Sequence, residues 1–485
     1  MRRAGILMPV ASLPSKYGNG DFGSSARTFI DLASEAGFSL WQVLPLNPLG
    51  YGNSPYQPYS SYALDDIYLS IENLLEQGLI DEIPKSEEPG IRIDYTASRR
   101  ERQKIYRKAY KRFKPDMNFL VFSYQEWVRN YAIFMTFKKK NRMKCWLEWP
   151  SALKDEPQSH EVDLKPYEDE ILYQAFLQYE LYLQWQDLRN YAHSKGITIM
   201  GDMPFYVGLD SADVWSHRDG FLLDKDGHPR FVAGVPPDYF SADGQRWGNP
   251  IYDWKHLKET DFDFWIERLG YAGRMFDIIR LDHFRAFDTY WQIPADCDTA
   301  RVGEWIEAPG YELFDDLLKK VPDIRIIAED LGDLRAEVLE LRDHYDFEGM
   351  RVIQFSFDPA GMGDDKSHLL VYTGTHDNGT ILQWYQEKSL SEKRKITSWF
   401  RQHGYMHRSF CDNMIDYAMD SKSDMVILPM ADLLKMGCEG RINTPGTVGS
   451  PNWEWCLKDF RSFKGRVKRL YEILSESKRT VKHRR

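Results

Sequence analysis

Residues 275–284 read MFDIIRLDHF, an apolar run that ends at Asp282. A short apolar run that stops at a charged residue is typical of a buried parallel strand ending in a functional site. The same pattern recurs at three further acids: Asp202 in ITIMGDMPF, Glu329 in IRIIAEDLG and Asp377 in VYTGTHDNGT. Four such acids in one chain predict a single pocket lined by strand ends.

Eight candidate strands extend this pattern over the whole chain, at 4–11, 40–46, 197–205, 275–284, 324–330, 349–357, 369–377 and 425–430. Helix-like stretches separate them, such as 24–36, which Gly37 is expected to end. Alternating strands and helices predict an α/β fold with a parallel sheet, and eight repeats predict a closed (β/α)8 TIM barrel. The active site of such a barrel lies at the C-terminal strand ends, where the four acids are expected.

The chain of 485 residues is interpreted as a single catalytic domain, 1–485, with two large insertions at the C-terminal face of the strands. Residues 47–196 follow the second strand and are expected to be mainly helical, with amphipathic stretches at 99–113, 122–140 and 171–195. Residues 206–274 are rich in Gly, Pro, Asp and Trp and carry a predicted active-site flap at 235–250.

Charge, hydropathy and cysteine content argue against several classes of protein. The formal net charge is -10 and the positive charges are scattered, which argues against a nucleic-acid partner. No run approaches the roughly 18 apolar residues of a membrane helix. The five cysteines are odd in number and form no CxxC pair, so neither a disulfide framework nor a zinc site is predicted, and a cytoplasmic location is expected.

The acids suggest glycoside chemistry, which needs one carboxyl group as general acid and a second as nucleophile or base. Asp282 and Glu329 end consecutive strands, and neighbouring strands lie about 4.8 Å apart, so a carboxyl separation of about 5–5.5 Å and a retaining mechanism are predicted. Arg280 faces the same side as Asp282 and is expected to keep it ionised. Burial is expected to keep Glu329 protonated. The alternative is a structural ion pair at Arg280–Asp282 and a helix cap at Glu329.

Histidines and two loops complete the candidate site. His283 and His376 adjoin two of the acids and are candidates for contacts to sugar hydroxyls, although a lone histidine is more commonly a satisfied buried residue. Loop 235–250 (VPPDYFSADGQRWGNP) combines aromatic and amide residues suited to a glycan, namely Gln245, Trp247 and Asn249. Loop 50–59 (GYGNSPYQPY) offers Tyr51 and Tyr56 in a Gly/Pro frame. Either loop is alternatively a structural turn.

Together these motifs resemble the 4-α-glucanotransferases known as amylomaltases or disproportionating enzymes, glycoside hydrolase family 77. The resemblance covers essentially the whole chain in one order: SLPS, LWQVLPL, GYGNSPYQPYSS, GDMPFYV, GVPPDYFSADGQRWGNPIYDW, RLDHFRAF, IIAEDLG, GMRVIQF, GTHDN and NTPGTVGSPNW. The flap motif and GYGNSPYQPYSS are the most specific. RLDHF and AEDLG alone would indicate only the wider α-amylase-like group. One departure is Cys456, where the family usually has arginine; we expect it to alter packing or a remote ion pair.

The resemblance implies roles for individual residues. Asp282 would be the nucleophile, Glu329 the general acid/base and Asp377 the transition-state stabiliser. Sugar contacts at the cleavage point are implied for Arg280, His283 and His376. The glucan groove would be lined by Ser54, Tyr56, Asp202, Gln245, Trp247 and Asn249, with Asp358 also reaching substrate and Tyr51 at a secondary glucan site.

The implied reaction moves a segment of an α-1,4-glucan donor to the 4-hydroxyl of glucose or a maltooligosaccharide acceptor, with cyclisation as a variant. It needs no metal and no organic cofactor, and a monomer or weak homodimer is expected. Two alternatives remain open: an α-amylase-like hydrolase, and a glycan-binding protein with an inactive barrel.

Overall fold

The computed structural model describes residues 2–83, 90–237, 241–332, 334–358 and 367–480. Eight parallel strands form one sheet in the order β10-β11-β12-β1-β2-β3-β6-β9. Their bounds are β1 Arg3–Leu7, β2 Leu40–Gln42, β3 Thr198–Met203, β6 Ile278–Leu281, β9 Ile326–Ala328, β10 Gly349–Val352, β11 Leu369–Tyr372 and β12 Met425–Pro429. Ile327 of β9 forms a parallel bridge to Glu348, next to β10, and this bridge closes the barrel. The predicted (β/α)8 fold is confirmed.

The strands are shorter than the apolar runs predicted. The run 4–11 leaves the sheet at Leu7 and turns through a 3-10 segment at Val10–Ser12. The run 349–357 becomes helix α14, Ile353–Ser356, after four strand residues. Apolar character persists beyond each strand because the following turns are also buried, so hydropathy alone does not mark the end of the pairing.

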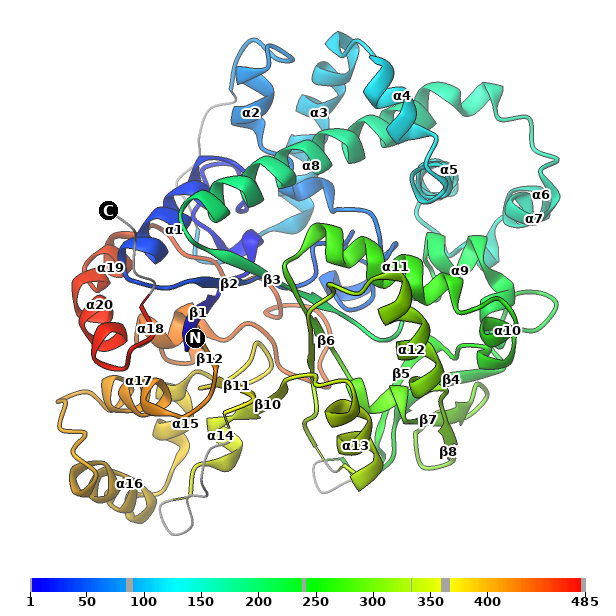
Figure 1. Cartoon of the computed structure of the whole chain (residues 1–485). Helices are drawn as coiled ribbons and strands as arrows, with labels where there is room; N and C mark the ends of the chain where they lie inside the picture. The colour runs from blue at the N-terminus through cyan, green and yellow to red at the C-terminus, as the bar shows by residue number, and fades with distance from the viewer. Residues whose placement is uncertain (1, 84–89, 238–240, 333, 359–366, 481–485) are drawn as a thin grey trace.

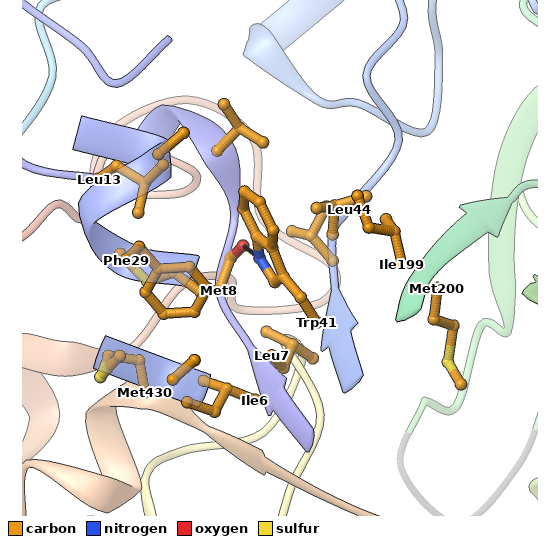
Figure 2. Close-up of a cluster of buried hydrophobic side chains, with 14 of the residues drawn as sticks. Ile6, Leu7, Met8, Leu13, Phe29, Trp41, Leu44, Ile199, Met200 and Met430 are labelled. Carbon is orange, nitrogen blue, oxygen red and sulfur yellow. Dashed lines mark hydrogen bonds between the residues drawn. The ribbon is translucent and has the colours of Figure 1, made fainter. Parts of the chain in front are cut away.

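The first three strands show how the core is packed (Figure 2). Trp41 of β2 is fully buried, its ring centroid lies 4.9 Å from that of Phe29, and its indole Nε1 donates a 2.8 Å hydrogen bond to the carbonyl of Met8. Phe29 belongs to α1, Ser24–Glu35, so the helix is held against the barrel wall by aromatic contact. Burying an aromatic side chain of this size contributes about 1.5–3 kcal/mol.

Between β2 and β3 the chain is mainly helical, and Figure 1 shows the long α8 running above the barrel with α3, α4 and α5 near its outer end. The bounds are α2 Ile71–Glu76, α3 Tyr95–Arg112, α4 Met117–Ser123, α5 Glu126–Lys140, α6 Ser151–Lys154, α7 Glu156–Ser159 and α8 Glu168–Ser194. The helix predicted at 122–140 is present as α5, but it begins at Glu126, because α4, capped by Asp116 through the Phe119 N–H, ends at Ser123 and a turn separates the two helices.

A second, antiparallel sheet lies beside the barrel mouth, in the order β5-β4-β7-β8. Its strands are β4 Phe231–Val235, β5 Gln245–Pro250, β7 Thr289–Pro294 and β8 Glu304–Glu307. The predicted flap 235–250 is therefore mostly the β4–β5 hairpin, with residues 238–240 outside the described part. The other two strands, β7 and β8, come from the segment after β6. The sequence patterns did not predict that this segment joins the flap hairpin in one sheet.

The remaining helices are α9 Ala212–Ser216, α10 Trp254–Glu259, α11 Asp263–Met275, α12 Gly310–Lys320, α13 Ala336–His344, α15 Ile381–Glu387, α16 Leu390–Gln402, α17 Phe410–Asp420, α18 Met430–Leu433, α19 Arg461–Lys464 and α20 Val467–Glu476. Close packing explains Gly201 in β3, since a Cβ there would lie 2.4 Å from the ring of Phe276. Among the helices of the described residues, none is both long and apolar enough to cross a bilayer.

Candidate active site

The structure brings the predicted acids to one mouth of the barrel. Asp282 follows β6 and Glu329 follows β9, its immediate neighbour in the sheet. The backbone continues to link the two turns beyond the strands: Glu329 N donates to Leu281 O at 3.0 Å, and Phe284 N donates to Glu329 O at 3.2 Å. Asp282 and Glu329 are therefore held on adjacent, hydrogen-bonded turns.

Arg280 is the centre of the charged cluster. Its Nη1 lies 2.7 and 2.9 Å from the two carboxylate oxygens of Asp202 and 2.9 Å from Oδ1 of Asp282. Asp202 is fully buried, whereas the Asp282 side chain is 29% exposed. Burial lowers the pKa of Arg280, but the two carboxylates outweigh this effect and raise the pKa above its ordinary value. A permanently charged guanidinium thus holds Asp282 at the open edge of the cluster, as predicted from the i, i+2 spacing.

Glu329 has a different environment. Its Oε2 accepts a 2.8 Å hydrogen bond from His283 N, and Oε1 accepts a 3.3 Å bond from Leu331 N. Burial and then the charge of Asp282 raise the pKa of Glu329 to about 8, against the opposing effects of Arg280 and the His283 N–H. Neighbouring Glu329 and Asp282 thus differ in environment, as an acid and a nucleophile require.

Asp377 reaches the same mouth from the loop after β11. Its Oδ1 accepts a 2.7 Å hydrogen bond from Asn443 Nδ2 and lies 3.4 Å from His376 Nε2. The His376 ring stacks on Tyr56 with centroids 5.1 Å apart, and the Tyr56 hydroxyl donates to Asp202 Oδ2 at 2.9 Å. One chain of contacts therefore runs from Asp377 through Tyr56 to Asp202 and the Arg280 cluster.

The pKa of Tyr56 is affected by several of the acids. Burial, followed by the charges of Asp202, Asp282 and Asp377, raises the pKa of Tyr56 well above its ordinary value, so its hydroxyl stays protonated. Asp202, Asp282 and Asp377 come from three different strand ends, and their charges all act on this one phenol.

His283 faces the flap hairpin. It adopts a left-handed backbone conformation with φ of 54°, and its ring meets Trp247 edge-on at 4.9 Å. Burial lowers the pKa of His283 to about 4, so the ring is neutral at pH 7. Its Nε2 is buried and has no hydrogen-bond partner among the described residues. This nitrogen lies beside the acids with its hydrogen-bonding capacity unused by the described residues.

The other flap residues are ordered by internal hydrogen bonds. The Trp247 indole donates to Gln245 Oε1 at 3.2 Å, and Asn249 Nδ2 donates to Val207 O at 2.9 Å. Gln57 Nε2 donates to Trp247 O at 3.0 Å, which ties the hairpin to the loop that carries Tyr56.

Three further predicted residues, Ser54, Tyr51 and Asp358, lie in connecting segments of the chain. Ser54 Oγ accepts a 3.3 Å bond from Tyr56 N, so it shapes the loop. Tyr51 lies in a 3-10 turn and its side chain is outside the described part. Asp358 is exposed and directly precedes the undescribed residues 359–366. In the described residues no group of three or more His, Cys, Asp or Glu side chains is arranged to hold a metal ion.

Sequence reasoning missed two residues of the site. Asn443 bonds Asp377, and Trp453 packs against Tyr56 and His376 with centroids 5.7 and 5.9 Å away. Both belong to NTPGTVGSPNW (443–453), a stretch that contributes to the family resemblance but in which no site residue was predicted. Their partners lie far away in sequence, so no local pattern identified them.

Comparison with known proteins decides the family. A model of the 4-alpha-glucanotransferase family matches residues 8–461. The chain belongs to this family. Among 4-alpha-glucanotransferases, that of Clostridium butyricum is 40% identical over 93% of this chain and 96% of its own length. That of Thermus thermophilus is 38% identical over 94% and 95%.

Solved structures agree with this assignment. The amylomaltase from Streptococcus agalactiae, determined in complex with acarbose, matches with a TM-score of 0.93 and 34% identity over 99% of this chain and 100% of that one. The amylomaltase from Corynebacterium glutamicum shares the fold, with a TM-score of 0.78 and 16% identity over 99% of this chain and 75% of that one. The chain is therefore an enzyme of the 4-alpha-glucanotransferase type that acts on glucans.

Proposed function

We propose that this chain cleaves an α-1,4-glucan and transfers the glycosyl segment to the 4-hydroxyl of glucose or of another α-1,4-glucan by a retaining double displacement. The observation that supports the mechanism most directly is the contrast between two adjacent carboxyl groups. Asp282 is ion-paired to Arg280 at the open edge of the cluster, whereas burial raises the pKa of Glu329 to about 8.

In the first step Glu329 donates its proton to the glycosidic oxygen while a carboxylate oxygen of Asp282 bonds to the anomeric carbon. The leaving glucan departs with that proton, and the sugar becomes a β-linked ester of Asp282. Asp377, aimed by Asn443, stabilises the positive charge that develops on the sugar ring.

In the second step Glu329, now ionised, takes the proton of an acceptor 4-hydroxyl. The acceptor oxygen bonds to the anomeric carbon and the Asp282 ester breaks, which restores the carboxylate. Two inversions leave an α-linkage. When the acceptor is the far end of the same glucan, the product is a ring.

Roles for sugar binding follow from the contacts. The free Nε2 of His283 and the ring of Trp247 lie on the Glu329 side. His376 and Tyr56 lie on the Asp377 side with Trp453. The hairpin around Trp247 is proposed to favour a sugar acceptor over water by covering the leaving-group side. Ser54, Gln245 and Asn249 are proposed to line the groove; Tyr51 and Asp358 stay predictions.

Maltotriose as sole substrate tests the reaction. Transfer yields glucose together with a ladder of longer maltooligosaccharides, resolved by anion-exchange chromatography. An α-amylase-like hydrolase would give only shorter sugars, and an inactive glycan-binding barrel would leave maltotriose unchanged.

Asp282→Asn tests the nucleophile. The amide keeps the size of the side chain but cannot form the ester, so kcat should fall by about four orders of magnitude or more. Thermal unfolding and maltotriose binding serve as controls and should be retained. Turnover close to that of the unmodified enzyme would remove Asp282 from the mechanism.

A further inference from the structure

The barrel closes through a thin seam between β9 and β10. Ile327 forms a parallel bridge to Glu348, and Ala328 N donates to Glu348 O at 2.9 Å. One step nearer the mouth, the backbone N–H of Met350 in β10 donates at 2.7 Å to the side-chain Oδ1 of Asp330. In a regular parallel ladder a backbone carbonyl of the neighbouring strand would accept this bond. A carboxylate therefore continues the pairing of the seam beyond the end of β9.

Arg342 of α13 holds this carboxylate in place. Its Nη1 bonds Oδ2 of Asp330, and the Asp330 and Arg342 side chains are only 4% and 11% exposed. Gly349 makes room for the pair, since a Cβ there would lie 2.6 Å from Asp330 Oδ2 and 2.7 Å from Arg342 Nη1. Charge-assisted hydrogen bonds of this kind are strong. The two oxygens of Asp330 thus fix one turn to β10 and to α13 at once.

Glu329, the residue before Asp330, faces the other neighbour of β9. Its backbone N–H donates to Leu281 O at 3.0 Å, and its Oε2 accepts from His283 N at 2.8 Å. Leu281 ends β6, and His283 lies in the turn that follows. Two consecutive residues therefore bind the turn to the chain on either side of β9. A shift on the Asp330 side would move the carboxyl group of Glu329.

We propose that Asp330, paired with Arg342, is a positioning residue for proton transfer by Glu329. Asp330 fixes the turn from which Glu329 gives its proton to the leaving oxygen and later takes the proton of the acceptor. Proton transfer requires the two heavy atoms to come within hydrogen-bond reach, and a misplacement of about 1 Å can cost about a hundredfold in rate. The proposal rests on the transfer reaction proposed above.

Two donors separate this role from a purely structural one. With maltotriose, followed by initial glucose release, the first step needs the proton of Glu329. With α-maltosyl fluoride, followed by fluoride release, it does not, because fluoride leaves without protonation. Asp330→Ala should lower kcat/KM for maltotriose about a hundredfold but kcat/KM for the fluoride less than about threefold. Arg342→Met should give the same split, because the carboxylate then loses its anchor on α13.

Asp343→Ala is the matched control. Asp343 is the second acidic partner of Arg342, with its Oδ1 2.5 Å from Arg342 Nη2, and its side chain is 60% exposed. The substitution removes one ion pair of the same arginine and leaves the bond to Asp330 in place. It should therefore change kcat/KM for neither donor.

Asp330→Asn supplies a second readout, the pH profile. Its oxygen can still accept from Met350 N, so this variant disturbs packing least and serves if Asp330→Ala fails to fold. The charge of Asp330 acts on Glu329 together with those of Arg280 and Asp282, and it raises the pKa of Glu329. Removing that charge should move the alkaline limb of kcat/KM for maltotriose to lower pH.

The thermal midpoint of each variant, measured by circular dichroism, shows the separate cost of breaking a buried ion pair. An equal fall of kcat/KM for both donors would overturn the positioning role, as would unchanged values for both. An alkaline limb that does not move in Asp330→Asn would also overturn it. Failure of the unmodified enzyme to convert maltotriose into glucose and longer maltooligosaccharides would instead refute the proposed function.

Discussion

At the scale of single residues, the site depends on the opposite environments of two neighbouring acids. Arg280 is paired with both Asp202 and Asp282, so one guanidinium stabilises a buried carboxylate and a reactive one. Glu329 lies one strand further along, and in the described part of the chain its carboxylate accepts from the backbone N–H groups of His283 and Leu331. Its proton is therefore retained at neutral pH, whereas an ionised Asp282 is stabilised by its ion pair.

The pH dependence of the reaction should follow Glu329. The protonated form donates the proton, burial raises its pKa to about 8, and so kcat/KM should be sustained at neutral pH and fall as pH rises through about 8. Glu329→Gln should abolish this limb, with severe loss on maltotriose but far less on an α-maltosyl fluoride, whose leaving group needs no proton. An unshifted alkaline limb in that variant would assign the titration to another group.

At the scale of elements, the loop after β11 is held at both ends by one buried carboxylate. Asp432 of α18 accepts hydrogen bonds from Thr373 Oγ1 at 2.6 Å and from Ile381 N at 2.8 Å. His376 and Asp377 lie between these anchors. The geometry of the catalytic loop therefore depends on a residue that touches no substrate.

Asp432→Ala should misplace the loop and leave the Ile381 N–H buried without an acceptor, a cost of about 1–3 kcal/mol. We expect kcat to fall about tenfold or more with the thermal midpoint lowered. Asp432→Asn is the control, because its carbonyl can still accept from Ile381 N and its amide can donate to the Thr373 hydroxyl. Equal kcat in the two variants would show that the hydrogen bonds to Asp432 do not position Asp377.

The β4–β5 hairpin is the second element with a testable role. Trp247→Ala removes the ring that packs on His283, so water should reach the leaving-group side more easily. The ratio of hydrolysis to transfer on maltotriose should increase, as measured by total new reducing ends relative to longer products. An unchanged ratio would argue against the hairpin as a barrier to water.

Some of these elements could be predicted from the sequence and others could not. The eight strand cores were predictable because a strand that is buried on both faces is continuously apolar. The acids were predictable because each of them lies in such an apolar run or directly follows it. The four-stranded sheet was not predictable, since β8 is exposed and the four strands of the sheet come from both sides of β6 in the chain. Asn443 and Trp453 were missed because their contacts are set by the meeting of loops, which local patterns do not encode. Oligomeric state, cytoplasmic location and the division into one domain with two insertions stay predictions.

At the scale of the whole molecule, Arg479 ties the last described residues to the start of the barrel. Its side chain is fully buried and donates to the carbonyls of Arg3, Met419, Ser421 and Ser423. Figure 1 shows the same junction, with α20 beside α1. The segment after α20 is thus part of the barrel's support.

Arg479→Met should leave several buried carbonyls without donors and destabilise the fold by about 3 kcal/mol or more. The measurement is the thermal midpoint by circular dichroism, with exposed Arg461→Met as the matched control. Arg479→Lys should be intermediate, because an ammonium can satisfy only some of the carbonyls. A thermal midpoint equal to that of the control would show that the hydrogen bonds of Arg479 contribute little to stability.

The pairing of β1 with both β2 and β12 has a consequence for biosynthesis. The ribosome delivers Arg3–Leu7 first, yet the neighbour on one flank, Met425–Pro429, leaves the exit tunnel more than four hundred residues later. Until then β1 can pair only on its β2 side, so any sheet that the nascent chain forms has one open edge, a kind of surface that is prone to aggregation.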